Sequence, residues 1–139
     1  MRQGFELVDH TADVGVRAWA PSSEGVFEEA AKAVFSLICD PLTIDQTETV
    51  DVRVDADGRD LLLAAWLNEL IYLFEAKRTL FVDFELVELD DIHLVARVTG
   101  EQLDLARHAI CGGVKAATLH QLSLNEGPSG WEAFVILDV

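Results

Sequence analysis

Alternating apolar and polar residues predict two short strands near the start of the chain. The first candidate covers residues 5–8, and the second covers residues 14–20, where Val14, Val16 and Ala18 fall on one side. Residues 9–13, with the sequence Asp-His-Thr-Ala-Asp, lie between them. We therefore expect two early strands separated by an acidic loop.

Two longer stretches carry apolar residues at the 3.6-residue period of an α-helix. The first begins after Pro21, where Ser22 and Ser23 are suitable N-caps, and should end near residues 40–41. The second covers residues 60–77, and its apolar face is broad enough for a helix in the centre of the molecule. Its exposed side would carry Asn68, Glu69 and Glu75.

Alternation returns in the middle of the chain. It predicts a strand over residues 49–55 and a hairpin of two antiparallel strands, residues 80–89 and 92–99, around the turn Asp90-Asp91. Residues 100–113 form a less regular connection.

The last part of the chain predicts a second hairpin. Residues 114–124 are mixed or extended chain, residues 125–130 are rich in turn formers, and residues 131–139 alternate as a closing strand. Runs of strands with two interspersed helices predict an α+β fold, with the helices packed on a largely antiparallel sheet. Because the 139 residues contain no linker and no repeat, we expect one compact domain over residues 1–139.

The composition is strongly acidic, with 25 Asp and Glu against 10 Lys and Arg and a formal net charge of -15. Such a molecule repels the phosphates of free nucleic acid, which proteins bind mainly through Lys and Arg. We therefore expect no direct high-affinity binding of nucleic acid. Any role in RNA metabolism would pass through a protein partner.

Cysteine usage and the absence of apolar targeting segments indicate the compartment. Cys39 and Cys111 are the only cysteines, and without CxxC spacing they favour two buried free thiols over a zinc site or a disulfide framework. The N-terminus lacks the pattern of a secretory signal, and no apolar run approaches membrane-spanning length. The expected location is the cytoplasm, with no membrane partner.

The closing strand places a carboxylate beside the end of the chain. Asp138 shares a strand face with Phe134 and Ile136, so it needs partners or water. Val139 adds an α-carboxylate, and Asp13 would complete an oxygen-only cluster if residues 9–13 lie beside this strand. Calcium or magnesium prefers such ligands. The alternative, which the strand pattern alone favours, is that Asp138 caps a frayed terminus in water.

Lys115 lies in an otherwise small and apolar segment, residues 114–118. A solvated surface lysine is the commoner explanation for such a position. In so acidic a chain, its ammonium could equally balance the carboxylates of a site or contact an anionic group on a partner.

The histidines and the known catalytic motifs specify no reaction. His10, His108 and His120 lack an i,i+4 histidine partner and an HExxH context, so a structural histidine is favoured for each over a zinc ligand or a general base. His93 alternates on a strand and is expected on the surface. The chain has no GxSxG, GxxxxGK[ST] or GxGxxG motif.

Four segments together resemble the archease family. They are DHTADVG at residues 9–15, WLNELIYLF at residues 66–74, VKAAT at residues 114–118, and LDV at residues 137–139. Each segment alone is a weak signal. Their order and spacing along nearly the whole chain make the combined match specific.

The resemblance implies a compact α+β cofactor protein that is not itself an enzyme. It would stimulate an RtcB-type tRNA-splicing RNA ligase by promoting guanylylation of the ligase's active-site histidine, repeated turnover and use of more nucleotides. The family likeness also implies a divalent metal ion held by Asp13, Asp138 and Val139, and it matches Lys115 to a functionally important lysine. His10, in the first motif, is an expected contact with the ligase.

Two departures from the family pattern concern the partner-facing surface. Leu119 stands where many relatives carry an aromatic residue, and residues 111–113 are a local variation of the loop before Lys115.

Two other classes of function remain open at this point. One is a chaperone-like or scaffolding module that binds a basic protein through its acidic surface, without localised chemistry. The other is a stand-alone metal-dependent hydrolase that uses Asp13 with His10 or His120, against which the missing catalytic motifs argue.

Overall fold

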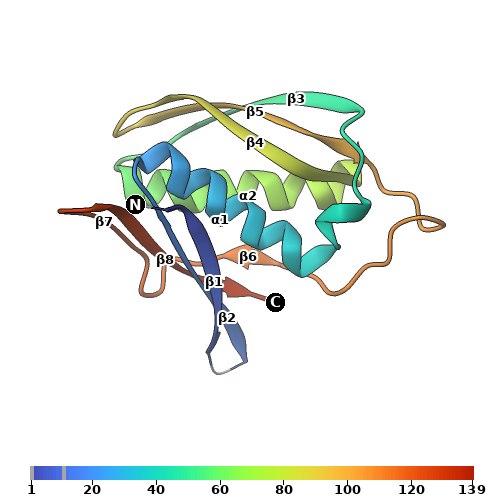
Figure 1. Cartoon of the computed structure of the whole chain (residues 1–139), viewed down its shortest axis with the longest axis horizontal. Coiled ribbons are helices and arrows are strands. Elements are labelled where there is room, and N and C mark those ends of the chain that lie inside the picture. The colour runs from blue at the N-terminus through green and yellow to red at the C-terminus, as the bar shows by residue number, and fades with distance from the viewer. Residues whose placement is uncertain (1, 11) are drawn as a thin grey trace.

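Two antiparallel sheets enclose the two helices in the computed structural model, which describes residues 2–10 and 12–139 (Figure 1). The first sheet has the strand order β1-β2-β8-β6, and β7 also pairs with β8. Its strands are β1 (Gly4–His10), β2 (Asp13–Ala20), β6 (Ala116–Ala117), β7 (Ser123–Gly127) and β8 (Gly130–Asp138). The second sheet has the order β3-β5-β4, and its strands are β3 (Glu48–Asp55), β4 (Thr79–Leu89) and β5 (His93–Gln102).

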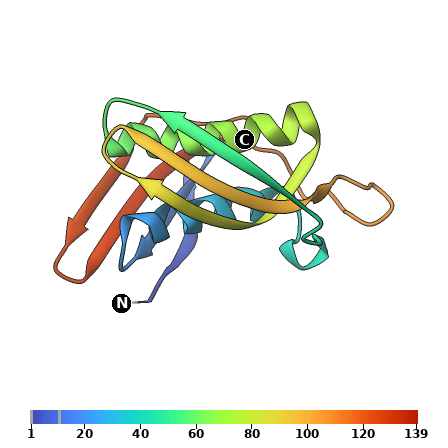
Figure 2. The same ribbon diagram turned by 90° about the horizontal axis from the view of Figure 1, so that it is seen from above.

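The helices form the middle layer. They are α1 (Ser23–Ile38) and α2 (Arg59–Lys77), and a short 3-10 helix, η1 (Pro41–Thr43), follows α1. Figure 2 shows the second sheet from above, lying over both helices. The predicted α+β fold with two main helices in a single compact domain is confirmed, with the difference that the antiparallel strands form two sheets.

Burial around α2 explains why two sheets are needed. Trp66 and Leu67 are fully buried together with most of the apolar residues of this helix, and α2 contacts strands of both sheets. A helix with buried residues on several sides must be covered by more than one layer. The indole N–H of Trp66 also donates a 2.9 Å hydrogen bond to the carbonyl of Phe27, which joins the two helices inside the core.

The helix ends follow local chemistry. Ser22 is the N-cap of α1, and its hydroxyl accepts a 3.1 Å hydrogen bond from the N–H of Gly25. Helix α2 ends at Lys77 and is followed by the C-cap Arg78, whose backbone is left-handed with φ 52° and ψ 39°. This turn directs the chain from α2 into β4.

Two predicted turns are shorter in the structure than the residue pattern indicated. Strands β1 and β2 extend to the pair His10 and Asp13, so most of the expected loop over residues 9–13 is strand. Strand β7 extends to Gly127, which pairs with Gly130, so the second turn is confined to residues 128–129. In both hairpins, backbone pairing continues through polar residues that single-strand patterns assign to turns.

The cysteine prediction was half wrong. Cys39 is buried, but Cys111 is exposed, because it lies in the irregular chain between β5 and β6 and not in the core. Both thiols are free. Within the described residues, no helix is both long and apolar enough to cross a bilayer.

Candidate metal site at the end of the first sheet

The strand register brings the two candidate aspartates to the same end of the first sheet. Val14 on β2 pairs with Leu137 on β8 in antiparallel register. Asp13 precedes Val14 and Asp138 follows Leu137, so the two aspartates are the next residues of neighbouring strands. Facing residues of antiparallel strands have Cα atoms about 4.5–5.5 Å apart. Residues far apart in sequence therefore meet where the site was predicted.

Both aspartates fall on the outer face of this sheet, away from the helices. Along β8, Ala133, Val135 and Leu137 are buried and alternate with the face that carries Asp138. By the same alternation along β2, Asp13 and Val14 lie on opposite faces of the sheet, and Asp13 shares its face with Gly15. Asp138 is exposed and Asp13 is half-buried, so neither charge is enclosed in the core.

The donors at this position suit a hard divalent cation. Asp13 and Asp138 have no side-chain hydrogen bond or ion pair with any residue the structure describes, and the neighbouring Val139 is 40% exposed. Over residues 2–10 and 12–139, no three His, Cys, Asp or Glu side chains are grouped to hold a metal ion. An ion here would therefore need the main-chain carboxylate of Val139 beside the two aspartates, an oxygen-only set typical of calcium or magnesium.

Lys115 lies at the same end of the sheet. Its backbone N–H donates a 2.7 Å hydrogen bond to the carbonyl of Asp138, and the next residue, Ala116, pairs with Asp138 in the β6–β8 ladder. The Lys115 side chain is exposed and forms no ion pair within the part of the chain that the structure describes. We call Asp13, Lys115, Asp138 and Val139 the terminal edge.

Asn68 on α2 holds β6 in place, a role that the sequence pattern missed. Its side-chain amide donates to the carbonyl of Ala117 at 3.1 Å and accepts from the N–H of Ala117 at 2.8 Å. The Asn68 amide thus makes the same pair of bonds with Ala117 that the backbone of a neighbouring strand would make. Because β6 is only two residues long, these bonds are important for its position. Asn68 is exposed as predicted, but helical spacing alone could not reveal a backbone partner 49 residues away.

His10 can be placed only by its backbone. Its main chain pairs with Asp13 at the end of the β1–β2 ladder, next to the terminal edge. Its side chain lies outside the described residues, as does Thr11 of the same motif. The expected contact between His10 and the ligase stays a prediction.

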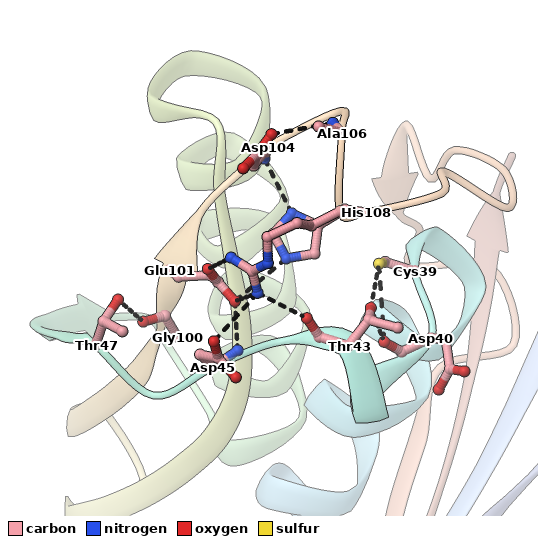
Figure 3. Close-up of polar contacts among 11 residues, drawn as sticks. Cys39, Asp40, Thr43, Asp45, Thr47, Gly100, Glu101, Asp104, Ala106 and His108 are labelled. Atoms are coloured by element: carbon pink, nitrogen blue, oxygen red, sulfur yellow. Dashed lines mark hydrogen bonds and ion pairs between the residues drawn. The ribbon is translucent and has the colours of Figure 1, made fainter.

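A second group of charged residues lies at the far end of β5, and its charges are paired (Figure 3). Glu101 accepts two hydrogen bonds from the Arg107 guanidinium, at 2.6 and 3.0 Å, and another from the backbone N–H of Asp45. Arg107 also lies 3.2 Å from the Asp45 carboxylate. We call Asp45, Glu101, Arg107 and His108 the Glu101 network.

His108 is a structural histidine, as predicted. It is 2% exposed, and its Nδ1 accepts a 2.9 Å hydrogen bond from the N–H of Asp104. The ring proton therefore sits on Nε2, which lies 3.2 Å from Glu101. Bonding to Arg107, to the Asp45 N–H and to His108 lowers the pKa of Glu101 from 4.5 to about 2.

His93 lies at the surface as predicted, with 35% of its side chain exposed, and it is paired with two acidic residues. Its Nδ1 lies 2.8 Å from the Asp55 carboxylate, and Nε2 lies 3.7 Å from Glu88. The hydrogen bond with Asp55 raises the pKa of His93 above its usual 6.5.

The chain belongs to the archease protein family, whose model matches residues 5–139. Curated relatives named "Protein archease" match along nearly their whole length. The relative from Methanopyrus kandleri is 37% identical and that from Pyrococcus furiosus 33% identical. The first alignment covers 97% of this chain and 99% of the relative, and the second covers 100% of both.

Solved structures have the same fold. The solution structure of protein 1598 from Methanobacterium thermoautotrophicum matches with a TM-score of 0.81 and 31% identity, over 98% of this chain and 99% of that chain. The crystal structure of a Thermotoga maritima protein, described as an archease and possible chaperone, matches with a TM-score of 0.62 and 20% identity, over 100% of this chain and 98% of that chain. The second likeness is one of fold alone.

Proposed function

We propose that this archease activates an RtcB-type tRNA-splicing RNA ligase, by promoting guanylylation of the ligase and repeated turnover, and that the terminal edge is the part that acts. Membership of the archease family supports the general role. The observation that carries the proposal is the register of β2 on β8, which sets Asp13 and Asp138 side by side at one end of the sheet.

The terminal edge has charges that the fold does not use. A charged group can contribute to the stability of a fold when it is paired or hydrogen-bonded, whereas these carboxylates and the Lys115 ammonium lie at the surface without ion pairs among the described residues. Asn68 holds the two-residue β6 against β8, and the Lys115 N–H bonds to Asp138, so the spacing of these groups is fixed by backbone. Fixed charges of both signs can position phosphate groups and metal ions for nucleotidyl transfer.

A divalent cation, calcium or magnesium, fits the oxygen donors of Asp13, Asp138 and Val139. When bound, such an ion would supply positive charge that orients and neutralises phosphate oxygens at the ligase active site. The two aspartates and the terminal carboxylate would hold it, and Lys115 would add a second positive charge beside it. The reacting histidine and the RNA belong to the ligase, so this chain acts as an accessory protein and not as the enzyme.

A single-turnover guanylylation assay of purified ligase, with and without this protein and added metal, tests the proposal. The wild-type chain should raise the rate, and Asp13→Ala, Asp138→Ala and Lys115→Ala should each reduce the stimulation by about 10²-fold, as for loss of a charge that stabilises a transition state. Glu126→Ala is the matched control, because Glu126 is an exposed carboxylate on β7 of the same sheet. Circular dichroism would establish that all variants are folded. Undiminished stimulation by all three site variants would refute the proposal.

A second candidate is a chaperone-like or scaffolding role, favoured by the net charge of -15 and by the description of the Thermotoga protein. A basic partner bound through general charge attraction would dissociate with rising salt, and binding would tolerate any single carboxylate substitution. Salt titration of the wild type and Asp138→Ala separates the two candidates. A site-specific role predicts loss in the variant at every salt concentration.

A further inference from the structure

A pocket at the C-terminal end of α2 has no role in the function proposed above. It has a volume of about 670 Å³ and lies where the chain between β5 and β6 projects from the body of the molecule (Figure 1). Its lining is Phe74, Arg78, Leu103, Leu105, Ile110, Gly112 and Gly113. We call this the Arg78 pocket.

The apolar part of the Arg78 pocket is exposed to an unusual degree. Leu105 is 77% exposed and Ile110 is 43% exposed, although both are large aliphatic residues. Clustered exposed apolar side chains that line one pocket are typical of a protein-binding surface, whereas scattered ones need no explanation. The lining is therefore suited to an apolar side chain from a partner.

Arg78 gives the pocket one positive charge. Although the chain has 25 acidic residues, the Arg78 guanidinium forms no ion pair or hydrogen bond with the residues that the structure describes. The position is also one where glycine is preferred, because the backbone is left-handed with φ 52°. Arg78 therefore places a positive charge at the pocket that no described residue pairs.

Two backbone hydrogen bonds fix the main chain of Arg78. The Arg78 N–H donates to the carbonyl of Phe74 at 2.9 Å, and the Arg78 carbonyl accepts from the N–H of Leu103 at 2.7 Å. These bonds join the end of α2 to the start of the projecting chain, so the backbone of Arg78 is held next to Leu103 of the apolar lining. The chain then continues through Gly113 to Lys115 of the terminal edge.

We propose that the Arg78 pocket is the docking site for a segment of the partner protein that carries an aromatic or aliphatic side chain next to a carboxylate. The apolar lining would bury the first group, and Arg78 would pair with the second. A polyphosphate or nucleic acid fits less well, because a single guanidinium in a chain of net charge -15 cannot offset several phosphates. The inference rests on the proposed function, in which the partner is the ligase.

Gly113 allows a steric test that spares the fold. A Cβ added at Gly113 has no neighbouring atom within 4 Å, and the residue's φ lies outside the left-handed region, so Gly113→Leu adds bulk at the pocket wall without strain. Gly127→Leu is the matched control, because a Cβ there comes no closer than 3.8 Å to the Gly130 carbonyl, on the distant β7–β8 hairpin. For the charge, Arg78→Glu is paired with Arg53→Glu, which changes an exposed arginine on β3.

The experiment titrates each full-length variant into the guanylylation assay and measures two quantities, the concentration for half-maximal stimulation and the maximal rate. Arg78→Glu and Gly113→Leu should raise the half-maximal concentration about tenfold while the maximal rate is unchanged, as expected for a docking contact. Both control variants should match the wild type.

Wild-type half-maximal concentrations for Arg78→Glu and Gly113→Leu would overturn the docking site and leave the proposed function intact. An equal increase for Arg78→Glu and Arg53→Glu would also overturn it, because the effect would then be general charge attraction. If the wild type gave no stimulation, the proposed function itself would fail. The two failures are therefore distinguishable in one set of titrations.

Discussion

The Glu101 network and the terminal edge are both groups of charged residues, but only the first has its charges matched. Glu101 is bonded by Arg107, His108 and a backbone N–H (Figure 3). The side chains of the terminal edge, in contrast, have no ion pairs among the described residues. A matched group of charges ties segments together, and its removal exposes unpaired partners. Unmatched charges at the end of a sheet contribute little to folding, and they are free to act on another molecule.

The largest predicted difference between the two regions is in thermal stability. Glu101→Ala leaves buried His108 without its acceptor and removes two hydrogen bonds of the Arg107 guanidinium, so the melting temperature should fall by several degrees. Asp138→Ala should leave the melting temperature unchanged, because its side chain is exposed and unpaired among the described residues. Differential scanning calorimetry measures both. A loss on Asp138→Ala as large as that on Glu101→Ala would contradict the distinction.

Asn68 is predicted to affect both stability and function. Asn68→Ala removes the two hydrogen bonds to Ala117, which should cost about 1–2 kcal/mol of unfolding free energy and loosen β6 beside Lys115. Gln102→Ala is the control, because the Gln102 amide also donates two hydrogen bonds, to Glu48 and Thr79 in the second sheet.

Chemical denaturation and the guanylylation assay, run on both amide variants, sharpen the comparison. Both variants should lose stability, but only Asn68→Ala should reduce the maximal stimulation. A similar reduction in Gln102→Ala would indicate that stability, and not the placement of β6, limits the activity.

Acid should weaken the Glu101 network. Because the pKa of Glu101 is about 2 in the folded protein and 4.5 ordinarily, the unfolded chain binds more protons between these values. The stabilisation from Glu101 is thus complete above about pH 5 and is lost as the pH falls through the interval toward 2. In melting curves recorded against pH, Glu101→Gln should show a shallower decline over this interval than the wild type. Identical slopes would contradict the pKa shift.

The smallest predicted effect concerns His93. Its pKa is raised by Asp55, so this pair stabilises the fold fully below the ordinary pKa of 6.5 and ceases to do so as the pH rises through the higher folded value. The stability of the wild type should therefore fall slightly as the pH rises above 6.5, and His93→Gln should not show this fall. Titration of the His93 ring by NMR, with Asp55→Asn as the comparison, checks the direction.

Local pattern predicted the elements well, because period and capping are properties of neighbouring residues. The helix predicted over residues 60–77 is observed as Arg59–Lys77, and the strand predicted over residues 49–55 as Glu48–Asp55. The division into two sheets was not predicted, since it depends on how α2 is covered. Turn lengths were also missed, because cross-strand pairing decides where a ladder ends.

The candidate site was predicted in part. From the sequence, only the family likeness and the possibility of a shared cation indicated that Asp13 and Asp138 lie close together. The register of β2 on β8 places them side by side. No pattern of neighbouring residues predicted the hydrogen bonds between Asn68 and Ala117 or the Arg78 pocket with its unpaired guanidinium. Both depend on chain segments that meet only in the folded molecule.

A calcium titration followed by NMR tests the central claim, that the terminal edge holds a metal ion, most directly. The amide signals of Asp13, Asp138 and Val139 should shift together and saturate, those of Glu101 should stay fixed, and Asp13→Asn should abolish the shifts. Shifts confined to residues outside the terminal edge, or no saturable shift with either calcium or magnesium, would contradict the account.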